Sequence, residues 1–149
     1  MEKYSYVWAS KQRRRYDCGI TCVLNISRYY GKMVTRADFK DLLKSARVKK
    51  NGTSMYDLIK KLAIYGIEAQ AIKCNSYSFV GNELCPLILF VETISGNGHY
   101  IIVYEVQAGI VTIADPSIWA ARISRLSINK FNKRYKWQGE AILINSVAD

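Results

Sequence analysis

The sequence has few of the features that divide a chain or place it in a membrane. Its 149 residues include only two prolines, Pro86 and Pro116, and they contain no low-complexity stretch, internal repeat or linker rich in proline and glycine. The longest unbroken apolar run, 86–91, is far too short to cross a bilayer, and residues 1–10 lack the apolar core and cleavage site of a signal peptide. Half of the residues are hydrophobic, so we expect one soluble, cytosolic domain that spans residues 1–149.

The four cysteines have neither the spacing of a common metal site nor the context of a disulfide framework. Three residues separate Cys18 from Cys22 and ten separate Cys74 from Cys85, rather than the two found in the commonest zinc motifs. Without a secretion signal, cysteines in a small chain are better interpreted as reduced thiols. We therefore expect no bound metal and no cofactor.

The one compositional outlier is a formal net charge of +10. Basic residues cluster at Lys11 with Arg13 to Arg15, at Lys49 and Lys50, and at 130–136. Such clusters fit a nucleic acid, an anionic membrane, an acidic partner or simply a solvated surface. The sequence shows no metal-finger spacing, RNA-recognition signature or basic helix with heptads, so we predict no nucleic-acid partner.

The pattern from Asp17 to Gly31 predicts a helix with a reactive thiol in its first turn. Asp17 is the candidate N-cap and Gly31 the expected C-terminal stop. Cys18 would then lie where unpaired backbone N–H groups and the positive end of the helix dipole favour a thiolate. Gly19 is expected to leave room beside the sulfur for a substrate carbonyl, and Cys22 to pack in the core. The apolar stripe of this helix consists of Ile20, Val23, Leu24, Ile26 and Tyr30.

Two further helices and then a sheet are expected. Capping-box patterns at Thr35 with Asp38 and at Ser54 with Asp57 each precede an apolar stripe, and Gly66 closes the second helix. After Gly66 the hydrophobic period changes toward two. The fold class is therefore α+β, with an N-terminal helical half packed on a C-terminal antiparallel sheet. The expected strands are Ile67 to Lys73, Leu87 to Val91, His99 to Val106, Ile110 to Ala114 and Ala141 to Asn145.

A predicted hairpin connects the only histidine with an aspartate. Gly109 lies in a turn between two expected strands, so His99 at the start of one and Asp115 after the end of the next would meet at the same edge. The flexible stretch Gly96, Asn97 and Gly98 suits a loop whose backbone approaches a substrate closely.

Gln12, Cys18, His99 and Asp115 follow one another in the order in which papain-like active sites are assembled from distant segments. A thiol needs an imidazole to take its proton, the imidazole needs a third group to hold its tautomer, and the oxyanion needs a preorganised donor. Taken singly, a buried cysteine, a structural histidine and an Asp-Pro turn are the plainer explanations. Their conjunction in this order indicates a thiol protease.

These residues give the chain a resemblance to the C39 peptidase domain, the papain-like protease fused to exporters of bacteriocins and peptide pheromones. This chain departs from the usual family pattern at two places. After Pro116, Ser-Ile-Trp stands in place of a small residue and glycine, and Ser127 to Phe131 lacks acidic residues. The matching segments are Gln12, Tyr16 to Cys22, Tyr29 to Gly31, Asn51 to Ser54, Gly66, Gly98 to Tyr100, Ala114 to Pro116 and Trp137 to Gly139.

The resemblance implies a cysteine endopeptidase that cleaves a leader peptide after a double-glycine-type motif. In this interpretation Cys18 is the nucleophile, His99 the general base and then acid, Asp115 the residue that orients His99, and Gln12 the oxyanion donor, assisted by the Cys18 backbone N–H. The expected substrate-binding residues are Tyr16, Asp17, Asn97, Gly98 and Tyr100. The alternative is a catalytically inactive, peptidase-like docking domain that binds exporter cargo without cutting it.

The resemblance also implies partners and a location. The expected substrate is a precursor peptide with an amphipathic leader helix and a Gly-Gly or Gly-Ala site. The transmembrane and nucleotide-binding domains of an ABC exporter would be the fused or associated partners, which places the domain at the cytoplasmic face of a bacterial membrane. The leader helix would dock in an apolar groove. Candidates for that groove are the exposed members of Tyr4, Tyr6, Trp8, Tyr29, Tyr77, Phe79 and Trp119.

Overall fold

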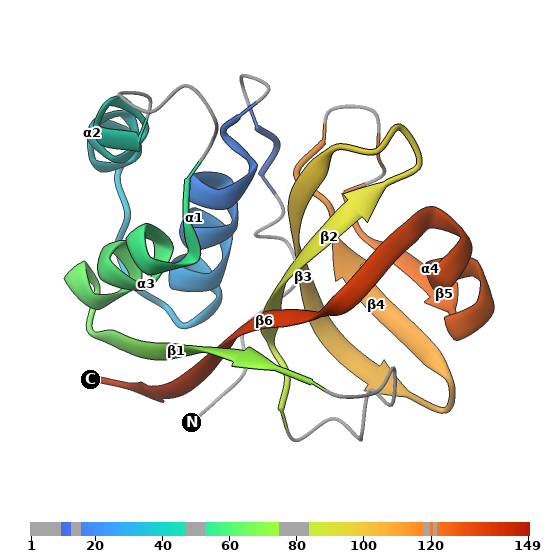
Figure 1. Cartoon of the computed structure of the whole chain (residues 1–149). Coiled ribbons are helices and arrows are strands. Elements are labelled where there is room, and N and C mark those ends of the chain that lie inside the picture. Colours follow the sequence, from blue (N-terminus) through green and yellow to red (C-terminus); the bar gives the residue numbers. More distant parts are fainter. Residues whose placement is uncertain (1–9, 13–15, 47–52, 75–83, 118–119, 121) are drawn as a thin grey trace.

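The computed structural model describes residues 10–12, 16–46, 53–74, 84–117, 120 and 122–149. Three helices come first, α1 (Cys18–Tyr29), α2 (Arg36–Ala46) and α3 (Met55–Ile64). The strands β1 (Ile67–Lys73), β2 (Leu87–Thr93), β3 (Gly98–Gln107), β4 (Ile110–Ala114), β5 (Ser124–Ser127) and β6 (Tyr135–Val147) follow, with α4 (Ile128–Arg134) inserted before β6. The predicted order of a helical half before a sheet half is confirmed (Figure 1).

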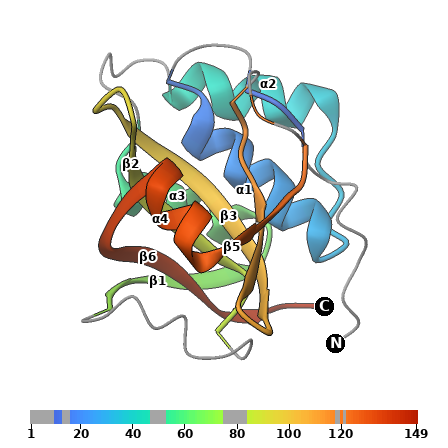
Figure 2. The same cartoon turned by 90° about the vertical axis from the view of Figure 1, so that its right-hand side faces the viewer.

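The strands form one six-stranded antiparallel sheet in the order β1-β6-β2-β3-β4-β5. The last strand in sequence therefore lies inside the sheet, between β1 and β2. The three N-terminal helices cover one side of the sheet, and α4 lies on the other (Figures 1 and 2). The sheet thus separates two apolar clusters, one under α1 to α3 and one under α4.

Two of the N-terminal helices begin with the predicted side-chain caps. At α2, Thr35 N–H donates to Asp38 Oδ2 at 2.9 Å and Asp38 N–H donates to Thr35 Oγ1 at 3.0 Å, which completes a capping box. At α3, Asp57 N–H donates to Ser54 Oγ at 3.2 Å. Asp17 occupies the N-cap position of α1 as predicted, but its side chain makes no cap hydrogen bond, and its backbone is already helical, with φ −87° and ψ −1°.

Glycines end α1 and α3 as predicted. Gly31 and Gly66 have φ of 76° and 73°, in the left-handed region that favours glycine. Their N–H groups donate to Arg28 O at 2.9 Å and Ala63 O at 3.1 Å, so each chain reversal satisfies a carbonyl of the last turn.

The predicted strands are confirmed, but strand β5 and helix α4 were not expected. Neither β5, with four residues, nor α4, with seven, is long enough to show a clear hydrophobic period. The last strand begins at Tyr135 rather than Ala141, because residues 135–141 alternate between buried and more exposed positions and extend the predicted strand toward its N-terminus. Within this stretch, Gly139 has φ +94°, and a Cβ there would lie 2.1 Å from Cys74 O, so only glycine fits.

No helix in the part of the chain that the structure describes combines the length and apolarity needed to cross a membrane.

Candidate active site

Cys18 is the first residue of α1, the most deeply buried helix of the fold. Every residue from Cys18 to Ser27 is buried, and Cys18 itself is 9% exposed. The carbonyl of Asp17 accepts hydrogen bonds from Thr21 N–H at 2.9 Å and Thr21 Oγ1 at 2.8 Å, which fixes the first turn. The thiol is therefore held at a rigid helix N-terminus, as predicted.

The β3–β4 hairpin brings His99 next to Asp115, as predicted. Ile102 of β3 pairs with Ala114 of β4, and continuing this register places Asp115 opposite Ile101, two residues from His99 and on the same face. His99 Nε2 lies 2.6 Å from Asp115 Oδ1, and both side chains are buried. The two residues form one hydrogen-bonded pair.

The ring of His99 bridges this carboxylate and the thiol of Cys18. Burial lowers the pKa of His99, but hydrogen bonds to Asp115 and Cys18, together with the negative charge of both, raise it to about 9. Nε2 contacts Asp115, so Nδ1 is the ring nitrogen left for the sulfur. The imidazole is therefore protonated at neutral pH and lies beside the sulfur of Cys18.

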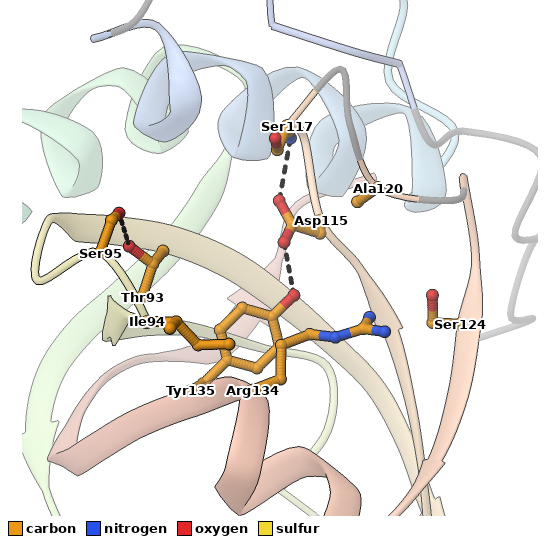
Figure 3. Close-up of a pocket in the computed structure, with 9 residues that line it drawn as sticks. All are labelled: Thr93, Ile94, Ser95, Asp115, Ser117, Ala120, Ser124, Arg134 and Tyr135. Atoms are coloured by element: carbon orange, nitrogen blue, oxygen red, sulfur yellow. Dashed lines mark hydrogen bonds between the residues drawn. The ribbon is translucent and has the colours of Figure 1, made fainter.

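Three donors converge on the buried carboxylate of Asp115. Its Oδ1 accepts from His99 and, at 2.9 Å, from the backbone N–H of Ser117, while its Oδ2 accepts from the hydroxyl of Tyr135 (Figure 3). Burial raises the pKa of Asp115, but the hydrogen bond and charge of His99, and then the bonds from Tyr135 and Ser117, lower it below its ordinary value. The carboxylate is thus ionised and held in one orientation.

Tyr135 is the member of this network that the sequence analysis missed. Its only sequence signal is that it lies two residues before Trp137, which begins a segment used for the family resemblance. Nothing in the local pattern connects it with Asp115, because the two residues meet only through the order of strands in the sheet.

The segment that carries Gln12 is tied to both halves of the site. Asn25 of α1 accepts from Ser10 N–H at 3.0 Å and donates to Ser10 O at 3.3 Å. Gln12 N–H donates to Pro116 O at 2.8 Å, directly after Asp115. The backbone of Gln12 is therefore placed between the helix of Cys18 and the turn of Asp115, and its role as an oxyanion donor stays a prediction.

Lys11 connects the same segment to the turn after β4. Its Nζ donates to the backbone carbonyls of Asp115 at 3.0 Å and Ala120 at 2.8 Å. Burial lowers the pKa of Lys11, the charge of Asp115 opposes that shift, and Arg122 adds to it. In the sequence Lys11 belongs to a basic cluster, but in the structure its ammonium group joins two backbone carbonyls beside the site.

Gly19 has a packing role. A Cβ at this position would lie 3.0 Å from Leu58 Cδ2 and 3.2 Å from Tyr100 Cδ2. The interpretation of Gly19 as open space beside the sulfur is therefore wrong, because side chains of α3 and β3 fill that space.

The five expected substrate-binding residues occupy different environments. Tyr16 is 47% exposed, and Asn97 is exposed in the β2–β3 turn, where its Nδ2 donates to Ser95 Oγ at 3.1 Å. Asp17 and Tyr100 are buried. Their contribution to substrate binding stays a prediction.

The buried and close-packed members of this set have structural contacts of their own. The hydroxyl of Tyr100 donates to Thr53 O at 3.0 Å, and its ring packs 5.0 Å from that of Phe90. A Cβ at Gly98 would lie 2.6 Å from Phe90 Cζ, so glycine allows Phe90 to cover the start of β3. These residues therefore have packing roles at the start of β3.

The remaining cysteines are free thiols, and the one groove candidate that the structure describes is a core residue. All four cysteines are free, and burial, followed by the charges of Cys18 and Asp115, raises the pKa of Cys22 well above its ordinary value. Tyr29 is 1% exposed and belongs to the core, and the other six candidates for a leader groove lie outside the described residues. Among the described residues, no three His, Cys, Asp or Glu side chains gather in a metal-binding arrangement.

Asp115 and Tyr135 also form part of the wall of an open cavity of about 580 Å³ (Figure 3). The end of β2 with the turn after it, the first residues after β4, and single residues of β5 and α4 form the rest of the wall. The carboxylate therefore lies beneath a surface depression beside the triad. The other lining residues are Thr93, Ile94, Ser95, Ser117, Ala120, Ser124 and Arg134.

One family model covers the whole site, from the cysteine at the helix start to the histidine and aspartate of the hairpin. Residues 6–149 match the model of the peptidase C39 family. The chain belongs to this family. The C39 domain is therefore a member of a family of cysteine peptidases, and its α+β fold is the papain-like fold of that family.

Curated relatives of this C39 domain are much longer proteins. It is 29% identical over 129 residues to the lactococcin-G-processing and transport ATP-binding protein LagD of Lactococcus lactis, covering 86% of this chain and 17% of LagD. It is 26% identical over 147 residues to the pediocin PA-1 transport/processing ATP-binding protein PedD of Pediococcus acidilactici, covering 93% of this chain and 19% of PedD. The chain thus spans less than a fifth of the length of these two relatives.

Solved structures share the fold over nearly the whole chain. The peptidase domain of Streptococcus ComA, a bifunctional ABC transporter, superposes with a TM-score of 0.75 at 26% identity, covering 92% of this chain and 97% of that domain. A double-glycine-motif protease from an AMS/PCAT transporter, solved with its leader peptide, gives a TM-score of 0.71 at 16% identity, covering 91% of this chain and 89% of that one.

Proposed function

We propose that this C39 domain is a cysteine endopeptidase that cuts the leader from a peptide precursor after a double-glycine-type site. The observation that carries the proposal is the network in which His99 bridges Cys18 and Asp115, with Nε2 at 2.6 Å from the carboxylate. A thiol, an imidazole raised in pKa and a fixed carboxylate are the groups that acyl transfer through a thioester requires.

In the first half of the reaction, Cys18 attacks the substrate. The Cys18 thiolate adds to the carbonyl carbon of the second glycine, and the carbonyl π electrons move to oxygen. The negative oxygen accepts hydrogen bonds from the Cys18 backbone N–H, which points out of the helix N-terminus, and from the amide of Gln12. As the C–N bond breaks, His99 gives its Nδ1 proton to the departing amine, and the leader remains as a thioester.

In the second half, water releases the leader. Neutral His99 takes a proton from a water molecule, whose oxygen adds to the thioester carbon. Breaking of the C–S bond returns the thiolate beside the newly protonated imidazole and frees the leader as a carboxylic acid. Asp115 stays ionised throughout and stabilises each imidazolium that forms.

We assign the substrate, partners and location on the same basis. The curated relatives are described as proteins that both process and transport, and one solved neighbour holds a leader peptide. We therefore propose a precursor with an amphipathic leader helix and a Gly-Gly or Gly-Ala site, and an ABC exporter that holds the domain at the cytoplasmic face of the membrane. Tyr16 is exposed two residues before Cys18, and Asn97 is exposed two residues before His99, so we propose that these two side chains narrow the site around two glycines.

Cleavage of a synthetic precursor tests the proposal. The probe is a peptide with an amphipathic helical leader, a Gly-Gly site and a short cargo segment, and its products are identified by mass spectrometry. We expect one cut after the second glycine and a fall in kcat/KM of about 100-fold or more when either glycine is replaced by valine, because a narrow site rejects any side chain. A matched substitution two residues into the cargo should have little effect. A cut elsewhere, or one that tolerates valine, would contradict the proposal.

Alkylation separates the peptidase from a domain that only docks cargo. At pH 6, where ordinary thiols are protonated, we expect iodoacetamide to modify Cys18 at least about tenfold faster than Cys74 or Cys85, because protonated His99 favours the thiolate. Peptide mapping gives the rate at each site, and buried Cys22 serves as the unreactive internal reference. Equal rates at Cys18 and Cys74 would favour the docking domain.

A further inference from the structure

We infer that Tyr135 is a positioning residue, which holds the carboxylate of Asp115 in the orientation that His99 requires. The inference rests on the proposed peptidase function and extends it to a residue outside the Gln12, Cys18, His99 and Asp115 set. The observation behind it is the hydrogen bond from the Tyr135 hydroxyl to Asp115 Oδ2 (Figure 3).

The sheet brings Tyr135 to this place. Val91 of β2 pairs with His99 on one side and with Trp137 on the other, so these three residues form a row across the sheet. Tyr135 lies two residues before Trp137 and pairs with Thr93, which puts its side chain on the same face as that of His99. The start of β6 therefore faces the residue that orients the histidine.

The two oxygens of Asp115 have separate tasks. Oδ1 accepts from His99 and from Ser117 N–H, and Oδ2 accepts from Tyr135. With a donor on each oxygen, the carboxylate group cannot rotate about its Cβ–Cγ bond without losing a hydrogen bond in a buried site. Removing the donor on Oδ2 leaves only the two bonds at Oδ1 to oppose that rotation, so we expect the contact between Oδ1 and His99 to loosen.

The hydroxyl of Tyr135 is a permanent donor. Burial raises the pKa of Tyr135, the charge and hydrogen bond of Asp115 raise it further, and Arg134 opposes the shift only in part. The proton therefore stays on the tyrosine at every pH at which the enzyme would work. The direction of the hydrogen bond, from tyrosine to carboxylate, is fixed.

The ring of Tyr135 is anchored independently of its hydroxyl. Tyr135 is 3% exposed, and its ring lies 5.3 Å from that of Phe131, which is fully buried on α4. Phenylalanine can keep this packing. The substitution Tyr135→Phe thus removes the hydrogen bond and leaves the aromatic contact in place.

The test compares Tyr135→Phe with the wild type by kinetics and by NMR. On the double-glycine peptide we expect kcat to fall about 10- to 100-fold with KM within about twofold, since the loss concerns a charged hydrogen bond that supports the chemical step. His99 is the only histidine, so ¹⁵N-histidine labelling follows a single imidazole. Its pKa should fall by about one unit from its wild-type value, because the contact with Asp115 weakens.

Tyr104→Phe is the matched control. Tyr104 is also a buried tyrosine, but it belongs to β3 and packs against Tyr29 under α1. It should leave kcat and the His99 titration unchanged. Incorporation of 3-fluorotyrosine at position 135 keeps the hydroxyl and should retain kcat within about threefold while shifting the His99 Nε2 proton signal, because the donor is more acidic.

Wild-type kcat and an unchanged His99 titration in Tyr135→Phe would overturn the inference, as would a fluorotyrosine variant whose His99 signal does not move. The NMR measurements need no substrate. If the wild type fails to cut the peptide, the proposed function falls, while a shifted His99 titration in Tyr135→Phe still supports the positioning contact.

Discussion

Cys18→Ala is expected to abolish cleavage of a double-glycine precursor, with a fall in kcat of about 10⁴-fold or more. The substitution removes the atom that forms the thioester, and no other thiol lies beside His99 in the described part of the chain. Cys22 is in the core, Cys74 directly follows β1, and Cys85 lies just before β2. Quenched-flow or long-incubation mass spectrometry measures the residual rate.

The fold should survive this change. Cys18 occupies the first turn of α1, and replacing its sulfur by hydrogen removes a single buried atom, at a cost of about 1 kcal/mol in the free energy of unfolding. Circular dichroism and thermal unfolding check that expectation. Cys74→Ala, at a half-buried thiol outside the site, is the matched control and should cleave at the wild-type rate. Cleavage by Cys18→Ala at a rate near that of the control would refute the assignment of the nucleophile.

Asp115→Asn is expected to lower kcat by about 10²- to 10⁴-fold. His99, Ser117 N–H and the Tyr135 hydroxyl all donate to the carboxylate, which has an acceptor for each of them. An amide has one acceptor oxygen and one NH₂ group, so at least one of these donors would face another donor. His99 then loses both its negative partner and its fixed orientation.

The same substitution should change the pH profile in a defined direction. The pKa of His99 is raised to about 9, so the imidazolium persists through neutral pH, and wild-type activity should fall only as the pH rises through about 9 and His99 loses its proton. Without the charge of Asp115 the imidazolium is less stable, so the alkaline limb should move down toward the ordinary value of about 6.5.

A pH–rate profile measures the alkaline limb, and NMR titration of the single imidazole measures the pKa directly. Asp38→Asn, at an exposed carboxylate in the capping box of α2, removes an equal charge far from the triad and should leave the profile unchanged. If Asp115→Asn keeps its alkaline limb near pH 9, then Asp115 does not hold the charge of His99.

Local patterns in the sequence were sufficient for the three N-terminal helices and the central hairpin. Thr35 with Asp38 and Ser54 with Asp57 form their caps within four residues, and Gly31 ends its helix through contacts with the preceding turn. Such contacts join neighbours along the chain, so residue type and spacing encode them. Asp17 is the exception, because deep burial of α1 and hydrogen bonds to the Asp17 carbonyl fix that turn without a side-chain cap.

Contacts that depend on the order of strands were beyond the reach of the sequence. The insertion of β6 between β1 and β2 carries Tyr135 to Asp115, and the alternation of residues 135–141 reveals neither that strand order nor this contact. Lys11 is 104 residues from Asp115 and has the sequence context of a surface charge, but its ammonium group binds the backbone carbonyl of Asp115.

By itself, the sequence determined the kind of chemistry and the order of its parts. The sequence limits the site to nucleophilic catalysis by sulfur. It has a thiol in the first turn of a helix, a single histidine at the start of a strand and an aspartate after the next strand. Only the tertiary structure decided how the aspartate is held, because the donors that orient a buried carboxylate come from three separate segments: β3, the turn after β4 and the start of β6. The hairpin spacing predicts His99 beside Asp115, and Ser117 lies only two residues from it, but the contact from Tyr135 is fixed by the packing of the sheet alone.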